Sequence, residues 1–196
     1  MPIKVYIWNF QGITEAWGHA SMSLNDGTHI SWWPCAGDER KALKGNAMKA
    51  PPAHCMTLDD DIRGEDGKPP DVTHYIPSGY INEEAIKTWW QSFSKEANWR
   101  ALDQNCSTVV YKALYAGSAL NFFPVVARLH YESTLVWTPY DVDQFVQRLI
   151  EAIASQAKET PSKQGSQGKQ IPSKHGSQGK QTPSKQRSQG KQIPSK

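Results

Sequence analysis

A cysteine at the predicted start of a helix is the residue in this sequence best placed to do chemistry. The polar stretch Asp103-Gln104-Asn105 precedes Cys106, and an apolar helical pattern begins directly after it. A thiol in the first turn of a helix lies at the positive end of the helix dipole, which favours the thiolate over the thiol. Because a thiolate is the form that attacks a carbonyl carbon, Cys106 is predicted to be a nucleophile.

Such a nucleophile needs a base, and His19 is the favoured histidine among the six in the chain. It follows Gly18, which allows a close backbone approach, and it opens a segment of alternating residues. Alternation in a strand would put His19, Ser21 and Ser23 on one face, with the apolar residues between them on the core face. Four other histidines are predicted to be structural, exposed or part of the tail: His54, His74, His130 and His175.

The turn at residues 25–27, Asn25-Asp26-Gly27, predicts a β-hairpin whose loop length decides which residues face His19. In a three-residue loop with Gly27 left-handed, Leu24 pairs with Thr28 and Ser21 pairs with Ser31. In a two-residue Asp26-Gly27 turn, Ser31 would lie on the opposite face.

The three-residue register supplies two residues that could orient the imidazole of His19. It puts Ser31, His29 and Trp33 on the same face as His19. Ser31 is the predicted third catalytic residue, and His29 is the alternative orienter. The sequence leaves the choice between them open.

The remaining polar residues suggest donors for an oxyanion but no site for a metal or cofactor. The backbone N–H of Cys106, with Gln11 or Gln104, is the predicted donor set for an oxyanion. The sequence has neither a Cys-x-x-Cys pair nor a His-Glu-x-x-His run, so no metal or cofactor is expected. The run Asp59-Asp60-Asp61 is not a calcium loop, because Pro70 occupies the twelfth position, where a bidentate Glu is needed.

The elements that must position these residues predict an α+β fold. An antiparallel sheet is expected from strands at 3–9, 19–24, 28–32 and 71–76, packed on about three helices. Asn82 caps the first helix, the second runs from Cys106 to Ala116 before Gly117, and Thr138-Pro139 opens the third. Residues 35–70 are polar and punctuated by Gly and Pro, and they are predicted to be a long excursion.

The chain ends in a basic repeat of period 11, with Pro161, Pro172, Pro183 and Pro194 in register. Eight of the 22 Lys and Arg residues, and none of the 19 Asp and Glu residues, lie after Thr160. The repeat has too few apolar residues to offset its ordering entropy, so residues 158–196 are predicted to be a disordered tail. Two interpretations stay open: a solvated tail, or a polycation that contacts anionic lipid, nucleic acid or wall polymer or serves in export.

The three cysteines are an odd and sparse set, which favours a reducing compartment over a disulfide framework. The short, alternating N-terminus is predicted to be a strand and not a signal peptide. No stretch approaches the roughly 20 apolar residues of a membrane span. The protein is therefore expected in the cytoplasm of its producer, with secretion only by a system that needs no signal peptide.

The order of these parts resembles the circularly permuted papain-like cysteine enzymes, which include permuted NlpC-type hydrolases and relatives of lecithin:retinol acyltransferase. The motifs that carry the resemblance are Gly18-His19-Ala20, the segment 26–34 (DGTHISWWP) and Asn105-Cys106. The histidine strand precedes the cysteine helix here, whereas papain-like enzymes have the reverse order. The acyltransferase relatives carry a second His twelve positions after the first, and Ser31 stands there in this chain.

The resemblance implies that residues 1–157 form a permuted papain-like catalytic domain in which Cys106 and His19 act as a dyad. The expected activity is hydrolysis of amide or peptide bonds, as in a peptidase or amidase. The sequences of the two hairpin motifs also resemble those of bacterial secreted effectors or toxins. That implies a peptide, peptidoglycan or host-protein substrate, and an immunity or adaptor protein as a partner.

Two other functions remain open at this stage. The same dyad could pass an acyl group to an amine or alcohol, as an acyltransferase does. Alternatively, Cys106 could be a buried structural cysteine in a non-catalytic module that binds ligands through an aromatic groove.

Overall fold

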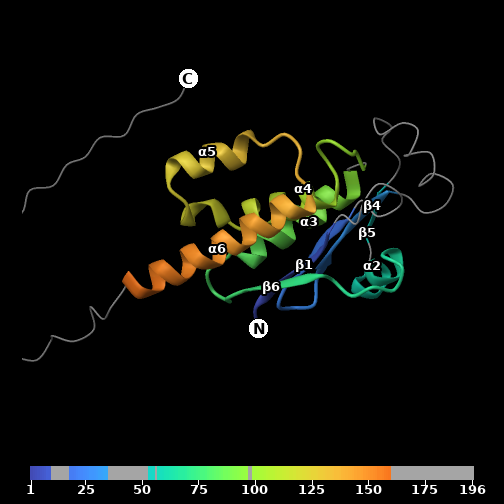
Figure 1. The fold of residues 1–196 in the computed structure, drawn as a ribbon, viewed down its shortest axis with the longest axis horizontal. Helices are drawn as coiled ribbons and strands as arrows, with labels where there is room; N and C mark the ends of the chain where they lie inside the picture. Colours follow the sequence, from blue (N-terminus) through green and yellow to red (C-terminus); the bar gives the residue numbers. More distant parts are fainter. Residues whose placement is uncertain (10–17, 35–52, 56, 97–98, 160–196) are drawn as a thin grey trace, which may run out of the picture. The chain divides into compact units, whose positions relative to one another are not determined.

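The computed structural model describes residues 1–9, 18–34, 53–55, 57–96 and 99–159, and the helices gather beside an antiparallel sheet (Figure 1). The predicted α+β class with an antiparallel sheet is confirmed. The basic repeat lies outside the described residues, so its predicted disorder stays a prediction.

The main sheet has four strands in the order β3-β2-β1-β6, and every pairing within it is antiparallel. A second sheet pairs β4 with β5. The central strand β1 (IKVYIW) is rich in β-branched and aromatic residues, which suit a strand covered on both faces. The strands are β1 Ile3–Trp8, β2 His19–Ser23, β3 His29–Ile30, β4 Trp32–Pro34, β5 Ala53–Cys55 and β6 Val72–Ile76.

The described residues form five α-helices and one 3-10 helix, η1, against about three helices predicted. All three predicted helices are present. Asn82 and Thr138 cap the first and third as predicted, and Asn105, the last residue of the polar stretch before Cys106, caps the second. The helices are α2 Leu58–Gly64, α3 Glu83–Glu96, α4 Cys106–Ala116, η1 Ala119–Phe122, α5 Val125–Ser133 and α6 Pro139–Glu159.

The predicted excursion over residues 35–70 is wrong where the structure forms β5 and α2. The sequence of α2, LDDDIRG, has no apolar stripe, and its one buried residue is Asp61. A Thr57–Asp60 capping box starts this helix. Without apolar periodicity, a helix this short gives no pattern by which the sequence could reveal it.

The predicted strand at 28–32 is also corrected, because Ser31 separates β3 from β4 and the two belong to different sheets.

Gly117 ends α4 as predicted, but its backbone is not left-handed. The absence of a side chain at Gly117 matters instead, since a Cβ there would lie too close to the side chains of Ile81 and Ile86, at 2.6 Å and 2.9 Å. The neighbouring Ser118 takes the left-handed conformation, with φ of 68°.

The core lies between the main sheet and the long helices. Helix α4 packs on β2, and α6 packs on β1 and β6. Ala20 and Met22 of β2 are fully buried in this core together with Val109 and Val110 of α4. Strand alternation directs the other residues of β2 to the opposite face of the sheet, where His19 meets Asp61 of α2.

Candidate active site

The hairpin has the three-residue loop, and this brings the predicted polar residues to one face. Met22 pairs with Ile30 and Ser23 with His29, and the Leu24 N–H donates to the Thr28 carbonyl at 2.9 Å. Gly27 has a φ of +88°, the left-handed conformation that this loop requires. The predicted register is therefore confirmed.

His19 lies at the start of β2, next to Ser31, and is only 2% exposed. Its Nε2 is 3.1 Å from the Ser31 hydroxyl oxygen and 3.3 Å from Oδ1 of Asp61. Because these two groups occupy Nε2, Nδ1 is the ring nitrogen left to serve a nucleophile.

Asp61 is the residue that the sequence did not predict for this site. Its fully buried carboxylate comes from α2 and accepts hydrogen bonds on both oxygens. Oδ1 accepts from the Ser31 hydroxyl at 2.5 Å and from the Trp33 indole N–H at 2.8 Å. Oδ2 accepts from Nε2 of His29 at 2.8 Å.

These contacts decide the charge of Asp61. Burial by itself would raise the pKa of the carboxyl, but hydrogen bonds from His19 and His29 and the charge of His19 outweigh it. The pKa therefore lies well below its ordinary range. The site contains a permanent buried carboxylate next to the histidine.

Cys106 is the first residue of α4, and its thiol is close enough to His19 for their charges to interact. Asn105 caps this helix, its side-chain oxygen accepting from the Thr108 N–H at 2.8 Å. Burial opposes the thiolate, but the charge of His19, its hydrogen bond and a hydrogen bond from the Ala20 backbone lower the pKa of Cys106. These partners shift the thiol toward the thiolate, and the dipole of α4 is expected to act in the same direction.

The same contacts favour the charged form of His19. Burial lowers the pKa of the imidazole, but the charge of Cys106 and hydrogen bonds to Asp61 and Cys106 raise it to about 9. A lowered thiol pKa beside a raised imidazole pKa is the pattern of a thiolate–imidazolium pair.

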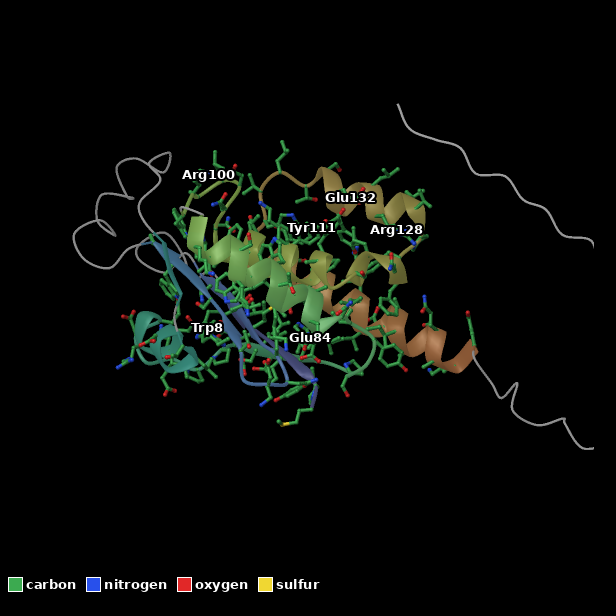
Figure 2. All side chains as sticks on the ribbon, turned by 180° about the vertical axis from the view of Figure 1, so that it is seen from behind. Trp8, Glu84, Arg100, Tyr111, Arg128 and Glu132 are labelled. Atoms are coloured by element: carbon green, nitrogen blue, oxygen red, sulfur yellow. The ribbon has the colours of Figure 1, made fainter. Side chains whose placement is uncertain are left out.

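Two indole rings flank the imidazole of His19. The Trp33 ring centroid is 4.3 Å from that of His19, and the Trp8 centroid is 5.5 Å away on β1. Trp8, labelled in Figure 2, lies at the α2 end of the sheet, where its indole N–H donates to the Lys68 carbonyl at 2.9 Å. The faces of such rings attract a cation, so they also stabilise a protonated His19.

The structure brings Cys106, His19 and Ser31 together, and it joins His29 to them through Asp61. Ser31 contacts the imidazole as its register predicts, but its hydroxyl proton goes to Asp61. His29 contacts the carboxylate and Ser23, with Nδ1 2.8 Å from the Ser23 hydroxyl oxygen. The best candidate to orient His19 is therefore the carboxylate that both residues hold.

The two glutamines predicted as oxyanion donors differ in what can be said of them. Gln11 lies outside the described residues. The side-chain oxygen of Gln104 accepts from Arg100 at 2.7 Å, and Arg100 also forms a two-pronged ion pair with Asp103 at 2.7 and 2.8 Å. Figure 2 labels Arg100 in this turn before α4. The role of Gln104 stays a prediction.

The four histidines that were predicted to be non-catalytic either have partners other than Cys106 or lie outside the described side chains. Nε2 of His74 on β6 is 2.5 Å from the Asp143 carboxylate on α6, which links the sheet to that helix. The ring of His130 packs beside Tyr131 on α5. The side chain of His54 and all of His175 lie outside the described part of the chain.

Within the described residues, no cluster of His, Cys, Asp and Glu side chains has a geometry that could hold a metal ion. The same residues include no helix that is both long and apolar enough to cross a membrane.

Comparison with known proteins identifies one family. Residues 68–169, just over half of the 196-residue chain, match the IcsB middle domain, a domain of a Shigella effector. The match includes Cys106 and begins after His19 and Asp61. No curated protein and no solved structure matches the chain. By the extent of the family match, this chain belongs to the IcsB middle-domain family.

Proposed function

We propose that this protein is a cysteine-dependent hydrolase of amide bonds, with a catalytic triad of Cys106, His19 and Asp61. One observation carries the proposal: a thiol at a capped helix start interacts electrostatically with an imidazole that also lies 3.3 Å from a buried carboxylate. A nucleophile, a base and a carboxylate that orients the base are the three roles of a catalytic triad for acyl transfer. The resemblance to permuted papain-like enzymes supports the same roles.

The proposed reaction starts from the thiolate–imidazolium pair. The Cys106 sulfur attacks the carbonyl carbon, and the carbonyl oxygen becomes an oxyanion near the start of α4, where the helix dipole favours negative charge. The imidazolium of His19 gives its proton to the leaving amine as the C–N bond breaks, which leaves a thioester on Cys106.

Water completes the cycle. Neutral His19 takes a proton from a water molecule that attacks the thioester, the C–S bond breaks, and the acid product leaves. The thiolate–imidazolium pair is then restored. Throughout, Asp61 holds the ring orientation and stabilises the imidazolium without taking up the proton itself.

The biological role that we propose is that of a bacterial effector acting on a peptide or host-protein substrate. Membership of the family of a Shigella effector domain supports this role. It is also compatible with export by a system that needs no signal peptide.

The test of the chemistry is to trap the acyl-enzyme with activated esters. The full-length protein is mixed with p-nitrophenyl esters of short and long acyl chains, and nitrophenol release and intact mass are followed. We expect a burst of nitrophenol and an acyl adduct on Cys106. Asp61→Asn should slow acylation about 100-fold or more, because the imidazolium loses its counter-charge.

Matched cysteine variants control for unselective thiol acylation. Cys106→Ala should lose the burst, and Cys55→Ala should keep it. An adduct that forms equally well in Cys106→Ala would contradict the proposal and favour the non-catalytic binding module. Peptide p-nitroanilides and host lysate, with Cys106→Ala as the control, then test for amide substrates.

The same experiment separates hydrolysis from acyl transfer. An added primary amine competes with water for the thioester, and mass spectrometry measures both products. If the amine takes most of the acyl group at millimolar concentration, the protein is an acyltransferase with the same triad.

A further inference from the structure

We propose that His29 is a positioning residue that fixes the Asp61 carboxylate in the orientation that serves His19. The inference rests on the proposed function, since it assigns a second histidine to the same site. His29 does not contact the sulfur or the substrate in this role; it acts through Asp61.

Both ring nitrogens of His29 are held. Nε2 is 2.8 Å from Oδ2 of Asp61, and Nδ1 is 2.8 Å from the Ser23 hydroxyl oxygen. An ionised carboxylate only accepts hydrogen bonds, so Nε2 must carry the proton toward Asp61. In a neutral ring Nδ1 is then an acceptor, and Ser23 donates to it. This arrangement fixes the tautomer and the rotation of the ring.

His29 holds the second oxygen of the Asp61 carboxylate, Oδ2. The Ser31 and Trp33 donors and Nε2 of His19 all lie on the Oδ1 side. A carboxylate held at one oxygen alone can turn about its Cβ–Cγ bond, because such terminal torsions are broad. A donor on Oδ2 sets the plane of the carboxylate and so the direction from Oδ1 to His19.

The hairpin register is what makes this arrangement possible. Ser23 and His29 pair directly across β2 and β3, so their side chains lie on the same face. His29 is 11% exposed, and its ring centroid is 6.1 Å from that of Tyr6 on β1. It is therefore enclosed at the edge of the site, where its hydrogen bonds are well shielded from water.

The test is the pH profile of Cys106 alkylation by iodoacetamide, which needs no substrate. Full-length wild type, His29→Phe and His29→Gln are compared, with Cys106 labelling followed by peptide mass spectrometry. In His29→Phe the midpoint of the profile should rise by about one pH unit, because a loosely held carboxylate stabilises the imidazolium less well. His29→Gln should remove most of this rise and return the midpoint toward that of the wild type, since its amide nitrogen can take the place of Nε2.

A matched control is the histidine–carboxylate pair at the other edge of the sheet. His74→Phe also removes a partly buried histidine from an aspartate, but that pair joins β6 to α6 outside the site. We expect His74→Phe to lower the thermal midpoint and leave the Cys106 profile unchanged. An equal shift in His74→Phe would mean that loosened packing, and not positioning, moves the profile.

Further outcomes decide the inference. An unshifted His29→Phe profile, or a shift that His29→Gln does not reduce, would overturn it. If His29→Phe fails to fold, Ser23→Ala takes its place, and the absence of any rise in its midpoint would overturn the inference. If wild-type Cys106 itself titrates like an ordinary thiol, the proposed function fails, and the His29 variants are not needed to show it.

Discussion

At the scale of single residues, the candidate site depends on one buried carboxylate. An isolated ionised carboxylate is costly to bury, but Asp61 receives donors from Ser31, Trp33 and His29 as well as the nearby charge of His19. Charge-assisted hydrogen bonds of this kind are the strong ones. Removing any donor leaves more of the desolvation cost of Asp61 uncompensated.

The lowered pKa of Asp61 predicts a loss of stability in acid. Its pKa in the folded protein lies below the ordinary value of 3.8, so below that pH the unfolded chain binds a proton that the folded chain does not. Its contribution to the free energy of unfolding is therefore full above about pH 4 and declines as the pH falls further.

Urea unfolding of wild type and Asp61→Asn measures this contribution. The difference in the free energy of unfolding between the two should be largest near pH 6 and should shrink toward pH 2. A difference that stays constant across this range would show that the pKa of Asp61 is the same in the folded and the unfolded chain.

At the scale of elements, the start of α4 is held by two hydrogen bonds in addition to its cap. The side-chain oxygen of Asn105 caps the helix, and its side-chain nitrogen donates to the carbonyls of Ala101 and Trp137 at 2.8 and 2.9 Å. The Asn105 side chain thus links the turn before α4 and the segment before α6 to the start of the helix, next to Cys106. The position of the sulfur depends on all three bonds.

We predict that Asn105→Ala lowers the free energy of unfolding by about 1–2 kcal/mol, the range for a lost cap. Chemical denaturation measures it. Asn105→Asp keeps the capping oxygen and loses the donors to the two carbonyls, so it should fall between wild type and Asn105→Ala. If Asn105→Ala were as stable as wild type, the cap would contribute nothing to this helix.

The elements that the sequence predicted are those with clear periodicity or clear end signals. Strand alternation and the left-handed Gly27 sufficed for the hairpin register, and thereby for the shared face of His19, His29 and Ser31. The helix starts at Asn105 and Thr138 followed from capping residues. Helix α2 had no such pattern, because Asp61 is its one buried residue.

At the scale of the whole molecule, the site joins segments from different parts of the chain. The family match covers residues 68–169 and contains the nucleophile, whereas His19 and Asp61 come before it. A fragment limited to the matched residues would lack β1, β2 and α2. Experiments on activity therefore need the chain from its first strand.

Deletion of residues 160–196 tests the predicted independence of the basic tail. The removed segment has no acid and hardly any apolar residue, so it offers little surface for the folded part to bury. We expect the same thermal midpoint and the same Cys106 alkylation profile as in the full chain. Differential scanning fluorimetry measures the midpoint, and a clear drop would mean that the tail packs on the folded part.

The sequence by itself determined the nucleophile and base candidates and the hairpin face, because strand alternation, helix caps and turn residues act over a few neighbouring positions. The third member of the site was decided by the tertiary structure alone. Asp61 becomes a partner of His19 because α2 packs against the hairpin, which brings together residues 42 positions apart. No local periodicity encodes such a contact. It depends on the position at which α2 packs, because the buried carboxylate of Asp61 needs hydrogen-bond donors from other segments of the chain.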